Sequence, residues 1–557
     1  MIINYTDANR AINLRWRDKE GNRQEENITD YAPYFFVSET EHEPDAYTVT
    51  MKINNRKAKI TYPFLYEHGD WFNLQGKRLK KVLVLKPYDI RAAKKLFGRT
   101  YEADVPFHYR YCVDNINSIP EYKLRKWYWD MEWLPKDHEQ SEAITCIVVY
   151  DNYNEQYTTY TWFPNCTNPP NFEGDSEKFF DTEKGMLEAF ITDIQKQDPD
   201  MLIAWFGLKF DLPKLIERLA ENDIDPRLLS PYNEVKYVNW DGVSDRIHEY
   251  SPVSQPIKGR ICLNLDVAFE RQWNDAQRGT LPSLALDYVA EIVLGEQKLV
   301  SEKFPDKNEF FMKGWLEDSE TYLQYAKKDV ELLVRIDEKN FCSDAILSLQ
   351  KLLIAPFDAC FYASNMGSIY FMRNAWWKAP TGEKSKERED YDGAFVYDPA
   401  KYGTHGRYKN VAAFDFSGLY PSMILARNIS WETLTSKKTE FAVNVSIPRD
   451  FSEVQKNRMV YFKTDKLGVL PKAVQELKTL RDSYKLKMRE AETEDEYNKW
   501  FNNQMAVKRL MASFYGIIAY QGFGWSNVIL AASITASARE AIREAAFKVM
   551  DIGEEEE

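Results

Sequence analysis

Two acidic residues within an apolar run are the first candidates for chemistry in this sequence. Asp130 and Glu132 lie in residues 127–133, whose aromatic composition favours a β-strand. Residues two apart on a strand point to the same face, so the two carboxylates would project together. Carboxylates held side by side repel each other, and a divalent cation between them relieves that repulsion. An isolated Asp-x-Glu pair is more often a solvated acidic edge, so other segments must decide between the two interpretations.

Two later segments place further candidates on helices. Asp211 follows the apolar run 201–205 and a turn, at the point where a helix is predicted to begin. Tyr325 and Asp329 are four residues apart in a segment of helical composition, which puts them on one face of that helix. Whether these side chains meet those of the strand depends on the tertiary fold.

A further carboxylate, Asp415, ends the apolar run 410–415, which is typical of a buried strand, and Pro421 follows in a predicted turn. A carboxylate at a strand end can hold a metal ion against a triphosphate, while N–H groups of the turn donate to phosphate oxygens. Residues 471–510 are predicted to form two antiparallel helices with a break near residues 493–495. Their Lys and Arg side chains offer cations for the same phosphates.

The segments that carry Asp130 and Glu132, Asp211, and Tyr325 and Asp329 resemble, in order and spacing, the Exo I, Exo II and Exo III motifs of family B DNA polymerases. The resemblance implies that the four carboxylates hold two Mg²⁺ or Mn²⁺ ions. One ion would lower the pKa of an attacking water, and the other would stabilise the leaving 3′-oxygen. Tyr325 would orient that water.

Three more segments resemble polymerase motifs of the same family, in its phage and archaeal form. Residues 415–422 resemble the first catalytic-carboxylate motif, residues 508–516 the Lys-x-x-x-Asn-Ser-x-Tyr-Gly motif, and residues 391–394 the Tyr-x-Gly-Gly/Ala element. The resemblance implies that Asp415 is a metal ligand and that Tyr420 is a steric gate against ribonucleotides. The implied nucleotide-binding residues are Ser417, Gly418, Leu419, Tyr420, Arg481, Lys485, Lys508 and Tyr515. The implied DNA-binding residues are Tyr391, Gly393 and Gly516.

Three positions depart from the family pattern. Phe206 stands five residues before Asp211, where family members usually carry Asn. A weaker hold on the primer end or weaker positioning of Asp211, and hence reduced exonuclease activity, is expected. Gly418 stands where Ser is common. Ala512 replaces an Asn that helps to shape the base-pair pocket, which puts the efficiency or fidelity of the polymerase site in doubt.

Length, charge and cysteine content bound the class of protein. A chain of 557 residues is too long for one hydrophobic core, so three or four domains are expected. The net charge of −13 argues against a nucleic-acid partner, but a whole-chain sum hides basic residues that are confined to grooves. The six cysteines form no Cys-x-x-Cys pair, and the sequence shows neither a signal peptide nor a membrane span. These features favour a cytoplasmic protein, in the host cytoplasm if the source is viral, that associates with the nucleoid.

The expected fold is a multidomain α/β architecture whose parts follow from the motifs. They are an N-terminal mixed domain at 1–105 to which 340–390 returns, an RNase H-like exonuclease domain at 106–339, a partial ferredoxin-like palm at 391–470 and 517–557, and two-helix fingers at 471–516. The thumb is expected to be absent. The charged stretch 381–390 is expected to be an exposed connector.

After residue 516 the sequence lacks the Asp-Thr-Asp motif that carries the family's second pair of catalytic aspartates. The leading hypothesis is the large, N-terminal chain of a split polymerase, with the motif and the thumb supplied by a second chain. Its partners would be primer–template DNA, single-stranded 3′ ends and dNTPs, with a nucleic-acid primer preferred and a sliding clamp as a further candidate. Alone it would show Mg²⁺-dependent 3′–5′ exonuclease activity and no extension. The alternatives are a stand-alone exonuclease with a vestigial palm, and a non-catalytic DNA-binding scaffold or truncation.

Overall fold

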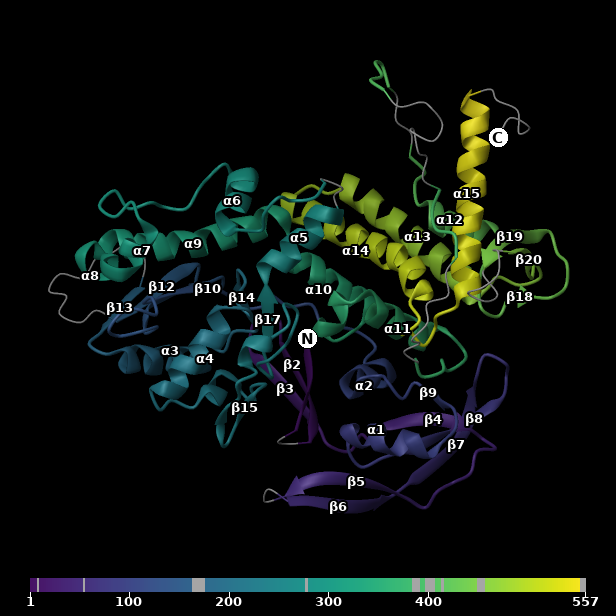
Figure 1. Cartoon of the computed structure of the whole chain (residues 1–557), viewed down its shortest axis with the longest axis horizontal. Coiled ribbons are helices and arrows are strands. Elements are labelled where there is room, and N and C mark those ends of the chain that lie inside the picture. Colours follow the sequence, from purple (N-terminus) through teal and green to yellow (C-terminus); the bar gives the residue numbers. More distant parts are fainter. Residues whose placement is uncertain are drawn as a thin grey trace. The chain divides into compact units, whose positions relative to one another are not determined.

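The chain is divided into two compact units, each built from two separate stretches of sequence (Figure 1). The first unit comprises residues 1–31 and 114–361, and the second comprises residues 32–113 and 362–557. The structure is a computed structural model. It describes residues 1–7, 10–53, 56–162, 176–275, 279–382, 391–395, 406–411, 415–447 and 456–550.

A six-stranded mixed sheet forms the centre of the first unit. Its strands, in sheet order, are β13 (Ser176–Phe180), β12 (Gln156–Trp162), β11 (Ile144–Asp151), β10 (Lys126–Trp133), β14 (Met201–Ala204) and β17 (Ile261–Asn264). β10 pairs antiparallel with β11 and parallel with β14, so it lies where the sheet changes direction. All four residues of β14 and of β17 are buried, as expected of parallel strands covered on both faces.

Helices cover both faces of this sheet. α9 (Ser319–Asn340) packs against β10 and β11, and α3 (Glu183–Gln197) packs against β12 and β13, on the opposite side in Figure 1. α9 buries one long apolar face that also carries Tyr325 and Asp329, so the helix presents both side chains to the sheet. Other elements of the unit are α4 (Asp211–Glu221), β15 (Val238–Asn239), β16 (Gly242–Val243), α5 (Leu265–Asp275), α6 (Leu286–Leu294), α7 (Lys307–Glu309), α8 (Trp315–Glu317) and α10 (Cys342–Leu353).

A network of buried charges attaches the N-terminal strands to the sheet. The strands are β1 (Ile2–Thr6), β2 (Ala11–Arg17) and β3 (Arg23–Ile28), which form an antiparallel sheet. Asp198 accepts from Arg15, Arg23 and Arg260, each at 2.8 Å. Burial alone would raise the pKa of Asp198, but the charges of Arg260, Arg15 and Arg23 lower it to about 2. One carboxylate therefore holds three guanidinium groups that are themselves mostly shielded from water.

Replacing Asp198 by Ala should strongly destabilise this unit, because three shielded cations would lose their shared anion. We expect a loss of about 3–5 kcal/mol in the free energy of unfolding, the usual cost of breaking a buried ion pair from one side. Urea denaturation measures it. The matched control is Glu317→Ala, which removes the partner of Lys303 in an exposed pair of the same unit and should cost less than about 1 kcal/mol. Equal losses in the two variants would contradict the assigned role.

The second unit begins with a small β-rich core. A four-stranded sheet has the order β7 (Leu65–Phe72), β8 (Arg78–Leu83), β4 (Tyr34–Ser38) and β9 (Thr100–Tyr101), and β5 (Ala46–Ile53) and β6 (Arg56–Pro63) form a hairpin. Phe35, Val82 and Tyr47 are among the buried residues that join the two sheets in one apolar core. α1 (Ile90–Ala93) packs against β5, and α2 (Phe107–Asn115) follows β9 in the chain.

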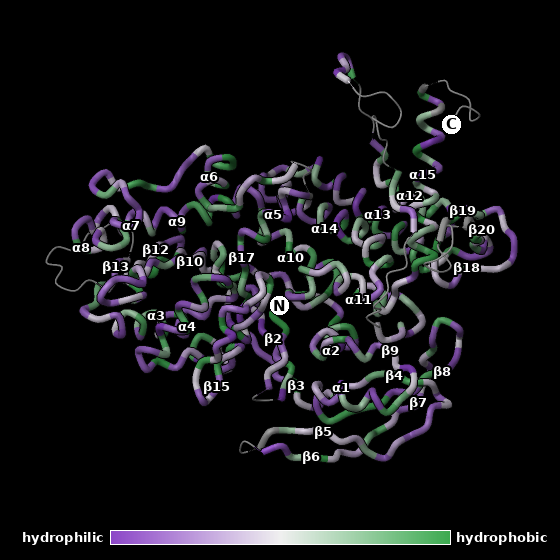
Figure 2. The backbone as a smooth tube through the Cα atoms, in the orientation of Figure 1, coloured by the Kyte–Doolittle hydropathy of each residue, from purple (hydrophilic) through white to green (hydrophobic). Residues whose placement is uncertain are grey.

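Helices dominate the remainder of the second unit. α13 (Val469–Arg489) and α14 (Glu494–Ala519) lie side by side in Figure 1, and purple and green alternate along both in Figure 2, as amphipathic helices require. Thr493 caps α14 by accepting from the backbone of Glu496, which explains the break that the sequence predicts there. The other elements are α11 (Ala363–Asn374), α12 (Leu419–Ala426), β18 (Leu434–Thr435), β19 (Phe441–Ile447), β20 (Lys456–Phe462) and α15 (Val528–Met550).

Two sequence predictions fall largely outside the described residues. The strand expected at 410–415 includes residues 412–414, which are not described, while Val411 and Asp415 beside them are exposed. The connector expected at 381–390 is described only at residues 381 and 382. Across the described ranges, no helix combines the length and apolar character needed to cross a membrane.

Candidate active site

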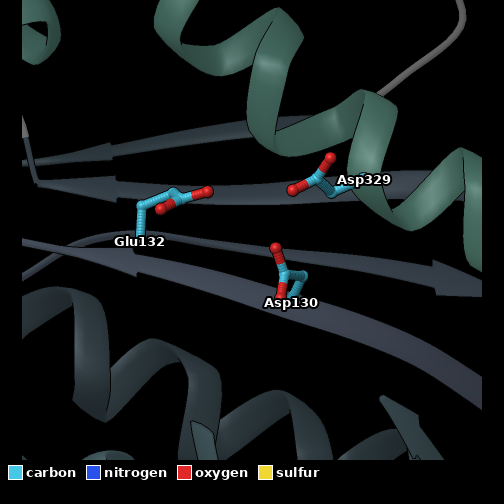
Figure 3. A group of neighbouring side chains, drawn as sticks. All are labelled: Asp130, Glu132 and Asp329. Carbon is cyan, nitrogen blue, oxygen red and sulfur yellow. The ribbon is translucent and has the colours of Figure 1, made fainter. Parts of the chain in front are cut away.

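Three carboxylates from distant parts of the sequence meet in the first unit. Asp130 and Glu132 project from the same face of β10, and Asp329 reaches them from α9 (Figure 3). One oxygen of each group lies within 4.8 Å of the others. The strand spacing of two places the first pair together. The pairing of β10 with β11 also shifts register between Glu132 and Trp133, a bulge of the kind that re-aims side chains beside active sites.

The remaining residues predicted for this site line the same cavity, whose volume is about 590 Å³. Asp211 enters as the first residue of α4, after a turn that leaves β14. Tyr325 lies one helical turn before Asp329 on α9. Aromatic side chains form much of the wall, and two Lys side chains contribute charge. The further cavity-lining residues are Met131, Trp133, Pro135, Trp205, Phe206, Phe210, Ala285, Leu286, Asp287, Lys298, Lys307 and Phe311.

Burial makes this group of acids electrostatically unfavourable. Burial, then the charge of Asp329, raises the pKa of the Asp130 carboxyl to about 7. Burial, then Asp130 and Asp329, raises the pKa of Glu132 well above its usual range. Burial and the charge of Asp130 raise the pKa of Asp211 in the same way. The chain brings these groups together despite their repulsion.

The donor set fits a divalent cation. Oδ1 of Asp329 is buried and has no hydrogen-bond partner, so it is available as a ligand. Carboxylate oxygens are the ligands that Mg²⁺ and Mn²⁺ prefer, and several acids around one point supply the charge that such an ion needs. Asp130, Glu132 and Asp329 would hold an ion directly, and Asp211 lines the same cavity.

Lys298 is a charged residue of this site that the sequence analysis missed. Its ammonium group donates to Oδ2 of Asp329 and lies 3.5 Å from the hydroxyl of Tyr325. Burial opposes the charged form, but Asp329, Tyr325 and Asp130 raise the pKa of Lys298 above its usual value. Lys298 thus offsets part of the negative charge. Its position in a segment with other charged residues gives no distinguishing signal in the sequence.

Two tyrosines predicted to bind the nucleotide and one predicted to bind DNA form an aromatic group in the second unit. The rings of Tyr420 and Tyr515 lie 4.5 Å apart between centroids, and the hydroxyls of Tyr391 and Tyr515 are 3.2 Å apart. Gly418 has a φ of 70°, which suits glycine, and immediately precedes Leu419 at the start of α12. Ser417 and Asp415 are exposed. Within the described ranges, no group of three potential metal ligands includes Asp415.

The segment around Tyr391 and Gly393 is held by α15. Arg539 donates to the carbonyls of Asp392 and Gly393 at 2.6 Å and 2.5 Å, and the hydroxyl of Thr535 donates to the carbonyl of Asp392 at 2.8 Å. The sequence analysis did not select Thr535 or Arg539. Their spacing of four on one helix face is a weak signal, because it is common in helices.

The predicted phosphate-binding cations lie on the helix pair. Arg481 and Lys485 are four residues apart on α13, and Nε of Arg481 donates to Gln504 of α14 at 3.2 Å. Lys508 lies on α14, as does Gly516, which is exposed. Burial lowers the pKa of Arg481, but its guanidinium remains charged at neutral pH.

Comparison with known proteins agrees with the exonuclease motifs and with the polymerase motifs identified in the sequence. The family model for the exonuclease domain of DNA polymerase family B matches residues 129–265, and the model for DNA polymerase family B matches residues 367–556. The chain belongs to the family B DNA polymerases. The resemblance drawn from the motifs is confirmed, including the presence of an exonuclease domain.

Archaeal DNA polymerases are among the relatives of this family B chain. The DNA polymerases of Pyrococcus glycovorans and Desulfurococcus sp. (strain Tok) are each 27% identical to it, over 79% of this chain and 53% of theirs. The chain therefore spans about half the length of these curated relatives. The family B DNA polymerase of the hyperthermophilic archaeon Pyrobaculum calidifontis shares the fold, with a TM-score of 0.72 and 18% identity over 99% of this chain and 72% of that chain. This likeness confirms the mixed α/β fold.

The free energy of unfolding of the metal-free chain should fall as the pH rises, because of the acids in the carboxylate cavity. The folded-state pKa values of Asp130 and Glu132 lie above the ordinary values of about 4. From about pH 4 to pH 7 the folded chain holds more protons than the unfolded chain, so the free energy of unfolding falls with rising pH. Mg²⁺ should raise the melting temperature more near pH 8 than near pH 5.5, because protons compete with the ion. Differential scanning fluorimetry in EDTA or Mg²⁺ measures both effects.

The matched control is the Asp130→Asn, Glu132→Gln double variant, which keeps the shapes of both side chains and removes both charges. We expect a flatter pH dependence and a smaller Mg²⁺ effect than in the wild type. At a Mg²⁺ concentration 100 times its dissociation constant, the free energy of unfolding of the wild type should rise by about 2.7 kcal/mol. The same Mg²⁺ effect in both proteins would contradict the assignment of the ion to this cavity.

Proposed function

We propose that this chain is a 3′–5′ exonuclease that removes nucleotides from single-stranded DNA ends, and that it forms part of a DNA polymerase. The observation that carries the proposal is the meeting of Asp130, Glu132, Asp211 and Asp329 with Tyr325 in one aromatic-lined cavity. The match of residues 129–265 to the exonuclease domain of family B supports it. The same match supports the RNase H-like class for this domain.

The residues of the cavity divide the work of hydrolysis. Two Mg²⁺ or Mn²⁺ ions, when bound, would lower the pKa of the attacking water and stabilise the leaving 3′-oxygen. Burial and the charge of Asp329 raise the pKa of Tyr325, so its hydroxyl stays protonated and can orient the water as a donor. Lys298, which donates to Asp329 in the metal-free site, adds positive charge to the cavity that would receive the phosphate. Aromatic residues such as Phe206 and Phe210 offer stacking surfaces to unpaired bases.

We further propose that the second unit binds an incoming dNTP for primer extension. Arg481, Lys485 and Lys508 supply cations for its phosphates, and Tyr420, packed on Tyr515, would exclude a ribose 2′-hydroxyl. Asp415 is the single polymerase carboxylate in this proposal. Extension would then need further catalytic aspartates and duplex-binding residues, contributed by a second polypeptide or by additional sequence. A sliding clamp is a further candidate partner.

The Asp130→Ala, Glu132→Ala variant should lose exonuclease activity on a 5′-labelled single-stranded oligonucleotide in Mg²⁺. The loss should exceed the roughly 10–100-fold that removal of an outer partner of a metal ligand causes. Gel analysis of the shortened products measures it. The control Glu121→Ala changes an exposed acid of the same unit and should keep the wild-type rate. Unchanged cleavage in the double variant would reject the proposed catalytic role and favour a DNA-binding scaffold.

These 557 residues alone should not extend a primed template with dNTPs, because they supply too few polymerase carboxylates to complete a metal site. Their dNTP affinity should nevertheless depend on α13. Replacing Arg481 and Lys485 by Ala should weaken binding of a fluorescent dATP about 10-fold or more, since each hydrogen bond to a charged group contributes about 1.5–3 kcal/mol. The control is Lys548→Ala, which changes an exposed side chain near the C-terminal end of α15. Primer extension by this chain, or equal affinity in all variants, would overturn the corresponding part of the proposal.

A further inference from the structure

The turn that precedes Asp211 contains an aromatic residue in an unfavourable backbone conformation. Phe206 has a φ of 55°, in the left-handed region that bulky residues rarely adopt. Lys209 and Phe210 both donate from their backbones to the carbonyl of Phe206, and Leu212 donates to the carbonyl of Gly207. The turn therefore runs directly into the first turn of α4. Strained conformations of this kind persist only where the surrounding structure holds them.

Two buried polar side chains, one on the last residue of β17 and one in the first turn of α5, hold the turn in this conformation. Oδ1 of Asp266 accepts from the backbone N–H of Phe206 at 3.0 Å, and Oδ1 of Asn264 accepts from the backbone N–H of Leu208 at 2.9 Å. Each side chain belongs to a residue that is only 3% exposed. Neither residue lines the cavity, so both act on the turn from behind.

Close packing makes the turn sensitive to these two hydrogen bonds. A Cβ atom at Gly207 would lie 2.5 Å from that of Ala204, so the turn sits directly on the end of β14. Phe206 and Phe210, at the two ends of the turn, both line the cavity, with their rings edge to face at 6.3 Å. A change of φ at Phe206 would therefore move both the aromatic wall and the start of α4, which carries Asp211.

We propose that Asn264 and Asp266 are positioning residues of the exonuclease site. They hold Phe206 in its left-handed conformation within the turn 205–210. They thereby fix Asp211 for catalysis and the ring of Phe206 for contact with the 3′-terminal base. This inference rests on the proposed exonuclease function, but the effect of the two side chains on the conformation of the turn is tested separately. It explains how the site tolerates Phe206 at a position where the backbone conformation favours Gly or Asn.

The first test compares Asp266→Ala and Asn264→Ala with Asp266→Asn, which keeps an oxygen acceptor for the N–H of Phe206. We expect the Ala variants to lower kcat on a single-stranded oligodeoxynucleotide at least 10-fold, and Asp266→Asn to stay within about 3-fold of the wild type. The melting temperature is measured for each variant. The control Asn152→Ala removes an acceptor of the Lys126 N–H, four residues along β10 from Asp130, and should lower stability without lowering kcat. Equal kcat values for Asp266→Ala and the wild type would overturn the proposal.

A double-mutant cycle separates positioning from a general structural role. Glycine adopts a positive φ without strain, so the Phe206→Gly background should no longer depend on Asp266. In that background we expect Asp266→Ala to lower kcat less than 3-fold. An undiminished loss in the Phe206→Gly protein would contradict the proposal.

A crystal structure of metal-free Asp266→Ala provides a readout that does not depend on activity. We expect residue 206 to move to a negative φ, with displacement of the start of α4. An unchanged turn would refute the positioning role even if the wild type proved inactive. If the wild type showed no exonuclease activity while the turn did rearrange, the proposed function would fail and the positioning of the turn would stand. If Asp266→Ala does not fold, a structure of Asn264→Ala provides the same test, because Asn264 accepts from the backbone N–H of Leu208 in the same turn.

Discussion

Repulsion among buried carboxylates is the constraint on which the first unit depends. Two unit charges 4 Å apart interact by about 4 kcal/mol at an effective dielectric constant of about 20, a large share of the roughly 5–15 kcal/mol that stabilises a domain. The carboxylates of Asp130, Glu132 and Asp329 come within 4.8 Å of one another, and Asp211 lines the same cavity. Lys298 offsets part of this charge by donating to Asp329. A site of this kind costs stability when empty, and bound cations recover it.

The surrounding fold opposes that repulsion with rigid elements. β10 pairs with β14 over residues 126–128 and with β11 over residues 127–133, so Asp130 and Glu132 cannot move apart without breaking the ladder to β11. α9 packs against β10 and β11 and holds Asp329 over the face of the sheet that carries Asp130 and Glu132. The link through Asp198 ties the N-terminal strands to the end of this sheet by three guanidinium groups.

Sequence reasoning succeeded where one local rule places the side chain. A spacing of two on a strand puts Asp130 beside Glu132, and a spacing of four on a helix puts Tyr325 beside Asp329. The meeting of the two elements came from the family resemblance, and the structure agrees with it. The catalytic roles themselves, and the domain boundaries, stay predictions. The expected strand before Asp415 cannot be compared, because residues 412–414 are outside the described ranges.

Other features had no signal that a single sequence could carry. Lys298 meets Asp329 across 31 residues, and Asp266 meets Phe206 across 60, so neither contact follows from periodicity. The left-handed φ of Phe206 contradicts the preference of its own residue type. The division of the chain after residue 31 also has no compositional mark, because strands lie on both sides of it. All of these depend on tertiary contacts.

The central claim is that the buried acids around Asp130 form a binding site for divalent cations that carries out exonuclease chemistry. Crystals soaked in Mn²⁺ and measured near the manganese absorption edge test it most directly. The account predicts anomalous density among Asp130, Glu132 and Asp329, with the ammonium group of Lys298 displaced from Asp329. A cavity without anomalous density, in which Lys298 still donates to Asp329 at saturating Mn²⁺, would contradict it.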